Sequence, residues 1–204
     1  MAGGWSIPRE WDGETAVIYG GGPSLNQADV DYARTRFRRI ACNDAFLLDP
    51  DCEVLCWCDC RWYLWNKNEI KRHCGKYRIA WKHVPQIAGA REIHFLQQLD
   101  SQKSLLKDPR YIIANNTGLG ALQIAYHFGA KRILLLGFDM RRVNKQMNWH
   151  QRHQKSVPPG ALDLFRTRIE NMAPALDRRG VEVINCTKDS ALRCFPYRDI
   201  REIT

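Results

Sequence analysis

Three short segments of the chain combine glycine with polar residues that can bind a phosphate or a nucleotide. The first, GGGPSL, spans residues 20–25; the second, NNTGLG, spans 115–120; and the third, GFDM, spans 137–140. Glycine lets the backbone approach a ligand closely, and the free amides at the start of a helix attract anions. If the three segments meet at one edge of a sheet, they form a pocket for a nucleotide or another anionic ligand.

The first segment matches neither of two common phosphate-binding motifs. Its glycines are not spaced as G-x-G-x-x-G, and no Gly-Lys-Ser/Thr follows them. Gly21 and Gly22 would still let the backbone approach a ligand. Pro23 would stiffen the turn, and Ser24 could cap a helix or donate a hydrogen bond to a phosphate. Taken alone, a tight connection between a strand and a helix explains the segment equally well.

Other polar side chains occupy neighbouring strand ends. Asn43 ends the run RRIACN, and its amide can both donate and accept hydrogen bonds, as suits a ribose or a base edge. Asn116 opens the second glycine segment, and Asp139 lies in the third. Either asparagine alone is more simply explained as a turn cap. Their joint position at strand ends favours a pocket.

A polar and basic segment, residues 141–160, follows the third glycine segment and is typical of a lid-like loop. It contains His150 and His153, and either imidazole could act as a general base at neutral pH. Arg141 and Arg142 could neutralise the charge of a departing phosphate. The alternative is a solvated basic loop with incidental histidines.

The cysteine-rich stretch CEVLCWCDC raises the question of a metal site. Cys56, Cys58 and Cys60 alternate, so on a strand they would point to one face. Zinc sites more often use Cys-x-x-Cys knuckles, and the only further pair is Cys74 beside His73. Buried thiols on a core strand are therefore favoured, and no metal is expected.

The elements that must position these groups alternate between strands and helices, which predicts an α/β fold: a layered sandwich with a mostly parallel sheet. A helix over 117–128 should stop at Gly129, and a helix over 161–180 should be kinked or broken near Pro174. The predicted strands are 15–20, 38–43, 53–58, 77–81, 92–96, 132–137 and 181–186. No linker divides the chain, so we expect one domain over 1–204.

Composition narrows the function. The net charge of +9 implies an acidic partner, but the basic residues are spread along the chain, so a nucleic-acid arm is not indicated. No apolar run reaches the roughly 18 to 20 residues that span a bilayer. The first residues lack the pattern of a secretory signal, so we expect a cytoplasmic protein whose eight cysteines are reduced.

In order, VIYGGGPSL, IACNDAF, NNTGLGALQIAYHFGAKRILLLGFDM, the histidines and VEVINCTKDSAL resemble the bacterial family-42 sialyltransferases and the related motility accessory factors, which glycosylate flagellin. The resemblance implies a Rossmann-like fold and a metal-independent glycosyltransferase that takes a CMP-linked nonulosonic acid as donor. The acceptor would be a hydroxyl of a glycan, a protein or another molecule. It places the nucleotide on Gly21, Gly22, Pro23, Ser24, Asn43, Asn116, Thr117, Gly118, Gly137 and Asp139. It makes His150 or His153 the base.

The chain also departs from that family. In the sialyltransferases a tyrosine that helps the phosphate leave follows the third glycine segment, whereas Met140 stands there in this sequence, before Arg141 and Arg142. We interpret the arginines as its replacement. One relative of the group is a pterin pyrophosphokinase, so a Mg²⁺-dependent pyrophosphokinase is an alternative. A non-catalytic module that binds a nucleotide or nucleic acid is another.

Overall fold

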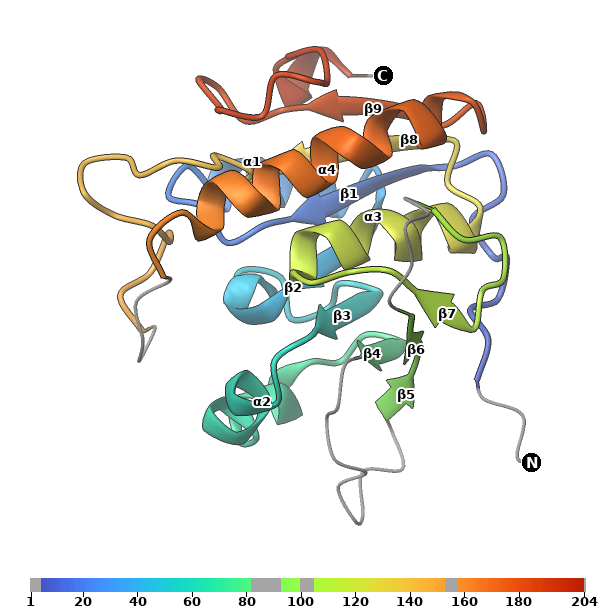
Figure 1. Ribbon diagram of the computed structural model, residues 1–204. Helices are drawn as coiled ribbons and strands as arrows, with labels where there is room; N and C mark the ends of the chain where they lie inside the picture. The colour runs from blue at the N-terminus through green and yellow to red at the C-terminus, as the bar shows by residue number, and fades with distance from the viewer. Residues whose placement is uncertain (1–4, 82–92, 100–104, 153–157, 204) are drawn as a thin grey trace.

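The structure is a computed structural model that describes residues 5–81, 93–99, 105–152 and 158–203. Its centre is a seven-stranded sheet with the order β5-β4-β3-β2-β1-β8-β9, in which every neighbouring pair is parallel (Figure 1). The strands are β1 (Thr15–Tyr19), β2 (Arg38–Cys42), β3 (Val54–Trp57), β4 (Tyr77–Ala80), β5 (Ile93–Phe95), β8 (Arg132–Leu136) and β9 (Glu182–Asn185). Two-residue strands β6 (Gln97–Gln98) and β7 (Tyr111–Ile112) pair separately.

Helices cover both faces of the sheet and make the Rossmann-like three-layer α/β sandwich that the sequence predicts. One face carries α3 (Thr117–Phe128) and α4 (Ala161–Asp177), and the other carries α1 (Gln27–Arg34) and α2 (Cys60–Asn66). Short 3-10 helices span Asn43–Leu47, Glu69–Arg72 and Ile200–Glu202.

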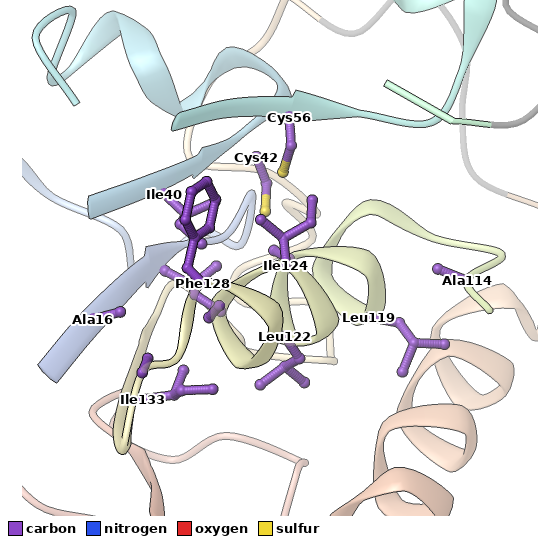
Figure 2. Packing of buried hydrophobic residues seen from close by; sticks show 14 of the residues in the cluster. Ala16, Ile40, Cys42, Cys56, Ala114, Leu119, Leu122, Ile124, Phe128 and Ile133 are labelled. Atoms are coloured by element: carbon purple, nitrogen blue, oxygen red, sulfur yellow. The ribbon is translucent and has the colours of Figure 1, made fainter. Parts of the chain in front are cut away.

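Alternation along β1 explains how one strand serves both layers. Ala16 and Ile18 belong to the cluster under α3, while Val17 and Tyr19 belong to the cluster under α1. Side chains of successive strand residues point to opposite faces, so a strand covered on both sides is apolar throughout. Figure 2 shows Ile124 and Phe128 of α3 directed toward the sheet.

The sheet order places a topological switch point at β1. From β1 the chain proceeds outward through β2, β3, β4 and β5 on one side, and β8 and β9 lie on the other. In open parallel sheets, ligands bind outside the carboxyl ends of the strands where the order reverses. The first and third glycine segments directly follow β1 and β8, so the fold brings them to this position.

Helix ends confirm one expectation and correct another. Asn116 caps α3 by accepting a hydrogen bond from the amide of Leu119 at 2.9 Å, and Gly129 ends the helix at φ 99°, as predicted. The N-cap of α1 is Asn26, whose side chain accepts from the amide of Asp29 at 3.0 Å. The expectation that Ser24 could cap this helix is therefore wrong.

Two further expectations are corrected. Helix α4 runs without a break through Pro174 to Asp177, so the expected break at this proline is wrong. Cys60 begins α2, so it does not extend the alternation of Cys56 and Cys58 along a strand. Among the described residues, no helix is both long and apolar enough to cross a membrane.

Candidate functional site

A cavity of about 570 Å³ opens at the carboxyl edge of the sheet, beside the switch point. It is lined by the residues after β1, β2, β3 and β8, by the starts of α2, α3 and α4, and by part of the 140–148 segment. Of the residues predicted from the sequence, those in its lining are Gly21, Gly22, Asn43, Asn116, Thr117, Gly118, Gly137, Asp139 and Arg141. The three glycine segments therefore meet.

The three glycines of the first segment differ in the space around the position that a Cβ atom would occupy. A Cβ on Gly20 would lie 2.5 Å from the carbonyl oxygen of Gly137, and one on Gly22 would lie 2.6 Å from the same oxygen and overlap the Asp139 carboxylate. These two positions are closed because the first and third segments pack directly together. A Cβ on Gly21 would meet nothing closer than Asn148 Oδ1, at 3.5 Å. Gly21 therefore presents open backbone to the cavity.

Asp139 fastens the first segment to the third. Asp139 is 2% exposed. One oxygen of its carboxylate accepts hydrogen bonds from the hydroxyl of Ser24 at 2.8 Å and from the amide of Ser24 at 3.2 Å. The structure describes both Pro23 and Ser24, and neither residue lines the cavity. Both the serine and the carboxylate thus have a local structural partner.

The segment after β9 supports the third glycine segment, and sequence reasoning assigned it no such role. The hydroxyl of Thr187 accepts from the amide of Phe138 at 2.9 Å, and the hydroxyl of Ser190 donates to the carbonyl of Phe138 at 2.6 Å. The amide of Ala191 donates to the carbonyl of Asp139 at 2.8 Å. Polar residues after another strand end, here CTKDS, were the signal that could have identified this support.

Asn43 links the ends of three elements. It follows β2 in a left-handed conformation, with φ 52°, and its side-chain oxygen accepts from the hydroxyl of Thr117 at 3.4 Å. The same hydroxyl lies 3.4 Å from the thiol sulfur of Cys58, after β3. Met140, after β8, is also left-handed, with φ 50°. Non-glycine residues in this region cost about 1 kcal/mol or more, so both strand ends hold strained backbone beside the cavity.

The lining also includes large apolar side chains, which were not predicted from the sequence. These side chains are Trp62 and Trp65 of α2, Leu162 and Phe165 of α4, and Met140 and Met147. The aromatic run RWYLW, which opens α2 directly after β3, was the available signal. A ligand here would contact both hydrogen-bonding groups and hydrocarbon.

The basic segment packs onto the first glycine segment through its backbone, since the amide of Trp149 donates to the carbonyl of Gly21 at 3.2 Å. Arg141 lines the cavity, and its Nε donates to the carbonyl of Asp189 at 2.7 Å. Arg142 is exposed, hydrogen-bonds the carbonyl of Lys145 at 3.4 Å and is not in the lining. The two predicted arginines therefore differ in position.

His150 lies at the edge of the site, outside the lining. Its side chain is 8% exposed, and Nε2 faces the buried carboxylate of Asp44 at 3.7 Å. Nδ1 accepts a hydrogen bond from the amide of Arg152 at 3.1 Å, so a neutral ring would carry its proton on Nε2, toward Asp44. The same carboxylate accepts from the indole N–H of Trp62 at 2.7 Å. His153 lies outside the described residues.

Two observations concern metal binding, namely the pKa of the Cys56 thiol and the grouping of side chains that could bind a metal ion. Burial raises the pKa of the Cys56 thiol well above its usual value, so it stays protonated in the core. Across the part of the chain that the structure describes, no three His, Cys, Asp or Glu side chains are grouped so that they could hold a metal ion. Asp139, in the cavity, already accepts two hydrogen bonds from Ser24.

Comparison with known proteins identifies the fold. No protein-family model matches the chain, and no curated protein matches it. A solved structure that resembles it is that of the sialyltransferase CstII from Campylobacter jejuni in complex with a substrate analogue, cytidine-5'-monophosphate. The TM-score is 0.58 at 14% sequence identity, and the alignment covers 91% of this chain and 85% of that one. At this identity the likeness shows a shared sialyltransferase-like fold.

Proposed function

We propose that this chain is a glycosyltransferase that uses a CMP-activated sugar, a nonulosonic acid, as its donor. The observation that carries the proposal is the cavity at the switch point, where three glycine segments converge in the same fold as a sialyltransferase that has been crystallised with cytidine-5'-monophosphate. Backbone that lies open to a ligand at strand and helix ends is what a nucleotide needs.

In this proposal the nucleotide binds along the polar wall. The open backbone at Gly21 and the start of α3, at Thr117 and Gly118, face the phosphate. Asn43 and Asn116, which both line the cavity, offer side-chain amides to the ribose and the base. Ser24 and Asp139 act by holding the two glycine segments together, since they are hydrogen-bonded to each other.

The proposed reaction is a displacement at the anomeric carbon of the donor sugar. The acceptor hydroxyl oxygen forms a bond to that carbon, the bond from the carbon to the phosphate oxygen breaks, and CMP leaves with the electron pair. Arg141, in the lining, stabilises the departing phosphate. The acceptor proton passes to a histidine of the basic segment, His150 or His153.

His150 can accept this proton only at Nδ1, because Nε2 faces Asp44. The acceptor hydroxyl would then have to displace the amide of Arg152 from Nδ1. The neighbouring carboxylate would stabilise the resulting imidazolium, which is the role of the aspartate in serine-protease triads. No metal enters the proposed step, because the phosphate charge is met by an arginine and backbone amides.

The test is a thermal-shift screen of nucleotides, because a ligand that binds only the native state raises the melting temperature. We expect CMP and CMP-sugars to raise it more than AMP, GMP or UMP do. A shift seen only with ATP and Mg²⁺ would favour a pyrophosphokinase instead. Steeply salt-dependent binding of DNA or RNA with no nucleotide shift would favour a binding module.

The two helix-capping asparagines provide a matched pair of variants. Asn116 caps α3 and lines the cavity, whereas Asn26 caps α1 and is not in the lining. Serine is also a good N-cap, so Asn116→Ser and Asn26→Ser should both fold. We expect the CMP shift to shrink in Asn116→Ser and to stay unchanged in Asn26→Ser. Equal shifts in both variants would contradict the proposed binding wall.

A further inference from the structure

The lining of the cavity includes residues that the proposed nucleotide site does not use, and most of these residues are apolar. Its polar side is formed by the strand ends and the start of α3. The rest of the lining comes from α2, α4 and the 140–148 segment, which contribute two tryptophans, a phenylalanine, a leucine and two methionines, together with Cys60, Arg61, Arg141 and Asn148. A charged, hydroxyl-rich nucleotide matches the first side. The second side calls for a ligand with apolar surface.

The apolar side is built from residues of α2 and of the first turns of α4 that line the cavity. Trp62 lines the cavity and is 3% exposed, and its indole N–H donates a hydrogen bond to Asp44 that fixes its position. Trp65, three residues along the same helix, is half-buried and also lines the cavity. Residues three apart lie on one face of a helix, so both indoles belong to the same face of α2.

Helix α4 repeats this arrangement at its first turn. Leu162 and Phe165 are also three residues apart, are half-buried and line the cavity, whereas Leu164 between them is 47% exposed and does not. One face of the helix is thus turned to the cavity, and its apolar residues are not fully covered by the described residues. Half-buried apolar side chains that gather around a cavity mark a binding surface more often than scattered exposed ones do.

We infer that the acceptor carries an apolar group, aryl or alkyl, next to its reacting hydroxyl, and that this group binds between Trp65 on α2 and Phe165 on α4. This inference rests on the proposed function, because it places the acceptor beside a bound CMP-sugar. A bare sugar could stack its C–H face on one indole. It would gain little from Leu162 and Met147, which offer hydrocarbon on the remaining sides.

The cavity's continuity supports an acceptor rather than a separate ligand. Met140 and Arg141 follow the third glycine segment directly, and both line the same cavity as Trp65 and Phe165. A molecule seated on the apolar side therefore reaches the place where the donor phosphate would lie. Apolar contacts fix its position, and the hydroxyl remains directed toward the polar side.

The experiment measures binding and transfer for matched pairs of glycosides, methyl and phenyl, of several common hexoses, in the presence of saturating CMP. We expect the phenyl member of at least one pair to bind at least tenfold more tightly by calorimetry. With a CMP-sugar donor, its KM should be lower by the same factor. In Phe165→Ala the preference should fall to threefold or less, while the CMP thermal shift is retained.

The control is Leu164→Ala, on the same helix but outside the lining, which should keep the full preference. Leu162→Asn is a second lining variant, and it keeps the test decisive if Phe165→Ala does not fold. Equal binding of methyl and phenyl glycosides, or no binding of either beside a normal CMP shift, would overturn this inference alone. Absence of any cytidine shift in the unmodified protein would instead overturn the proposed function.

Discussion

The hydroxyl and the amide of Ser24 both donate to the same carboxylate oxygen of Asp139, 115 positions along the chain. This pair of hydrogen bonds joins the segment after β1 to the segment after β8, at the switch point of the sheet. These hydrogen bonds hold together two of the segments whose backbone lines the cavity.

Removing the hydrogen bonds between Ser24 and Asp139 should destabilise the fold. In Asp139→Asn the buried group loses its charge and can turn an N–H toward the amide of Ser24, so we expect unfolding free energy to fall by about 1–3 kcal/mol. Ser24→Ala removes the hydroxyl and leaves the amide, so its cost should be smaller, about 1 kcal/mol. Urea denaturation measures both.

The control for this prediction is Asp163→Asn, because the side chain of Asp163 is 70% exposed and pairs with Arg166 only at the surface. We expect it to change the unfolding free energy by less than about 1 kcal/mol. If Asp139→Asn were no more costly than this control, the hydrogen bonds from Ser24 would not hold the two segments together.

The first glycine segment should separate stability from binding. Gly22→Ala drives a Cβ into the Asp139 carboxylate and the carbonyl of Gly137, so it should cost about 1–3 kcal/mol, as overpacking does. Gly21→Ala has room and should leave the melting temperature nearly unchanged. Its methyl group would, however, project into the nucleotide side of the cavity. We expect a reduced CMP shift in this variant, and a full CMP shift would place the phosphate elsewhere.

Separate His150→Ala and His153→Ala variants test the base. General-base catalysis is worth about 10²- to 10⁴-fold, so one of the two should lose transfer activity by that factor and keep its CMP shift. If His150 is the base, Asp44→Asn should also lower kcat and move the acidic limb of its pH profile to lower pH, because the carboxylate no longer stabilises the imidazolium. Full activity in both histidine variants would remove the base from this proposal.

Two core histidines should make the fold sensitive to acid. Burial lowers the pKa of His73 to about 4 and that of His127 to about 4, from 6.5. Below pH 6.5 the unfolded chain therefore binds more protons than the native protein, and stability falls with pH until it levels off near pH 4. Each group should contribute roughly 3 kcal/mol to this loss.

Urea denaturation between pH 7 and pH 4 measures this loss, with His73→Gln as the test variant. Nε2 of His73 lies 2.8 Å from the carbonyl of Cys52, and a glutamine amide can donate there without titrating. The variant should lose less stability between these pH values than the unmodified protein does. An unchanged pH slope would show that His73 does not take up a proton on unfolding.

The sequence predicts the sheet and its helices well where the signals are local. The helix over 117–128 has both its cap and its stop within the segment, and the strand RILLL is apolar enough to be buried on both faces. These features are the ones that bring the three glycine segments to one edge. Their convergence could therefore be anticipated without coordinates.

What the sequence did not indicate depends on partners that are distant in the chain. Ser24 looks like a helix cap until Asp139 is found beside it, and a serine near a helix start is ambiguous by itself. The apolar part of the lining arises only because α2 and α4, about 100 residues apart, line one cavity. The two-residue strands β6 and β7 are too short to leave a pattern.

Asn43 and Met140 place side chains beside the cavity at two left-handed backbone positions that glycine would adopt without strain. Glycine adopts such a conformation without strain but loses more conformational freedom on folding, so Met140→Gly and Asn43→Gly should each change the unfolding free energy by less than about 1 kcal/mol. Each exchange would also delete a side chain from the cavity wall. The two side chains would then serve the cavity rather than the stability of the fold.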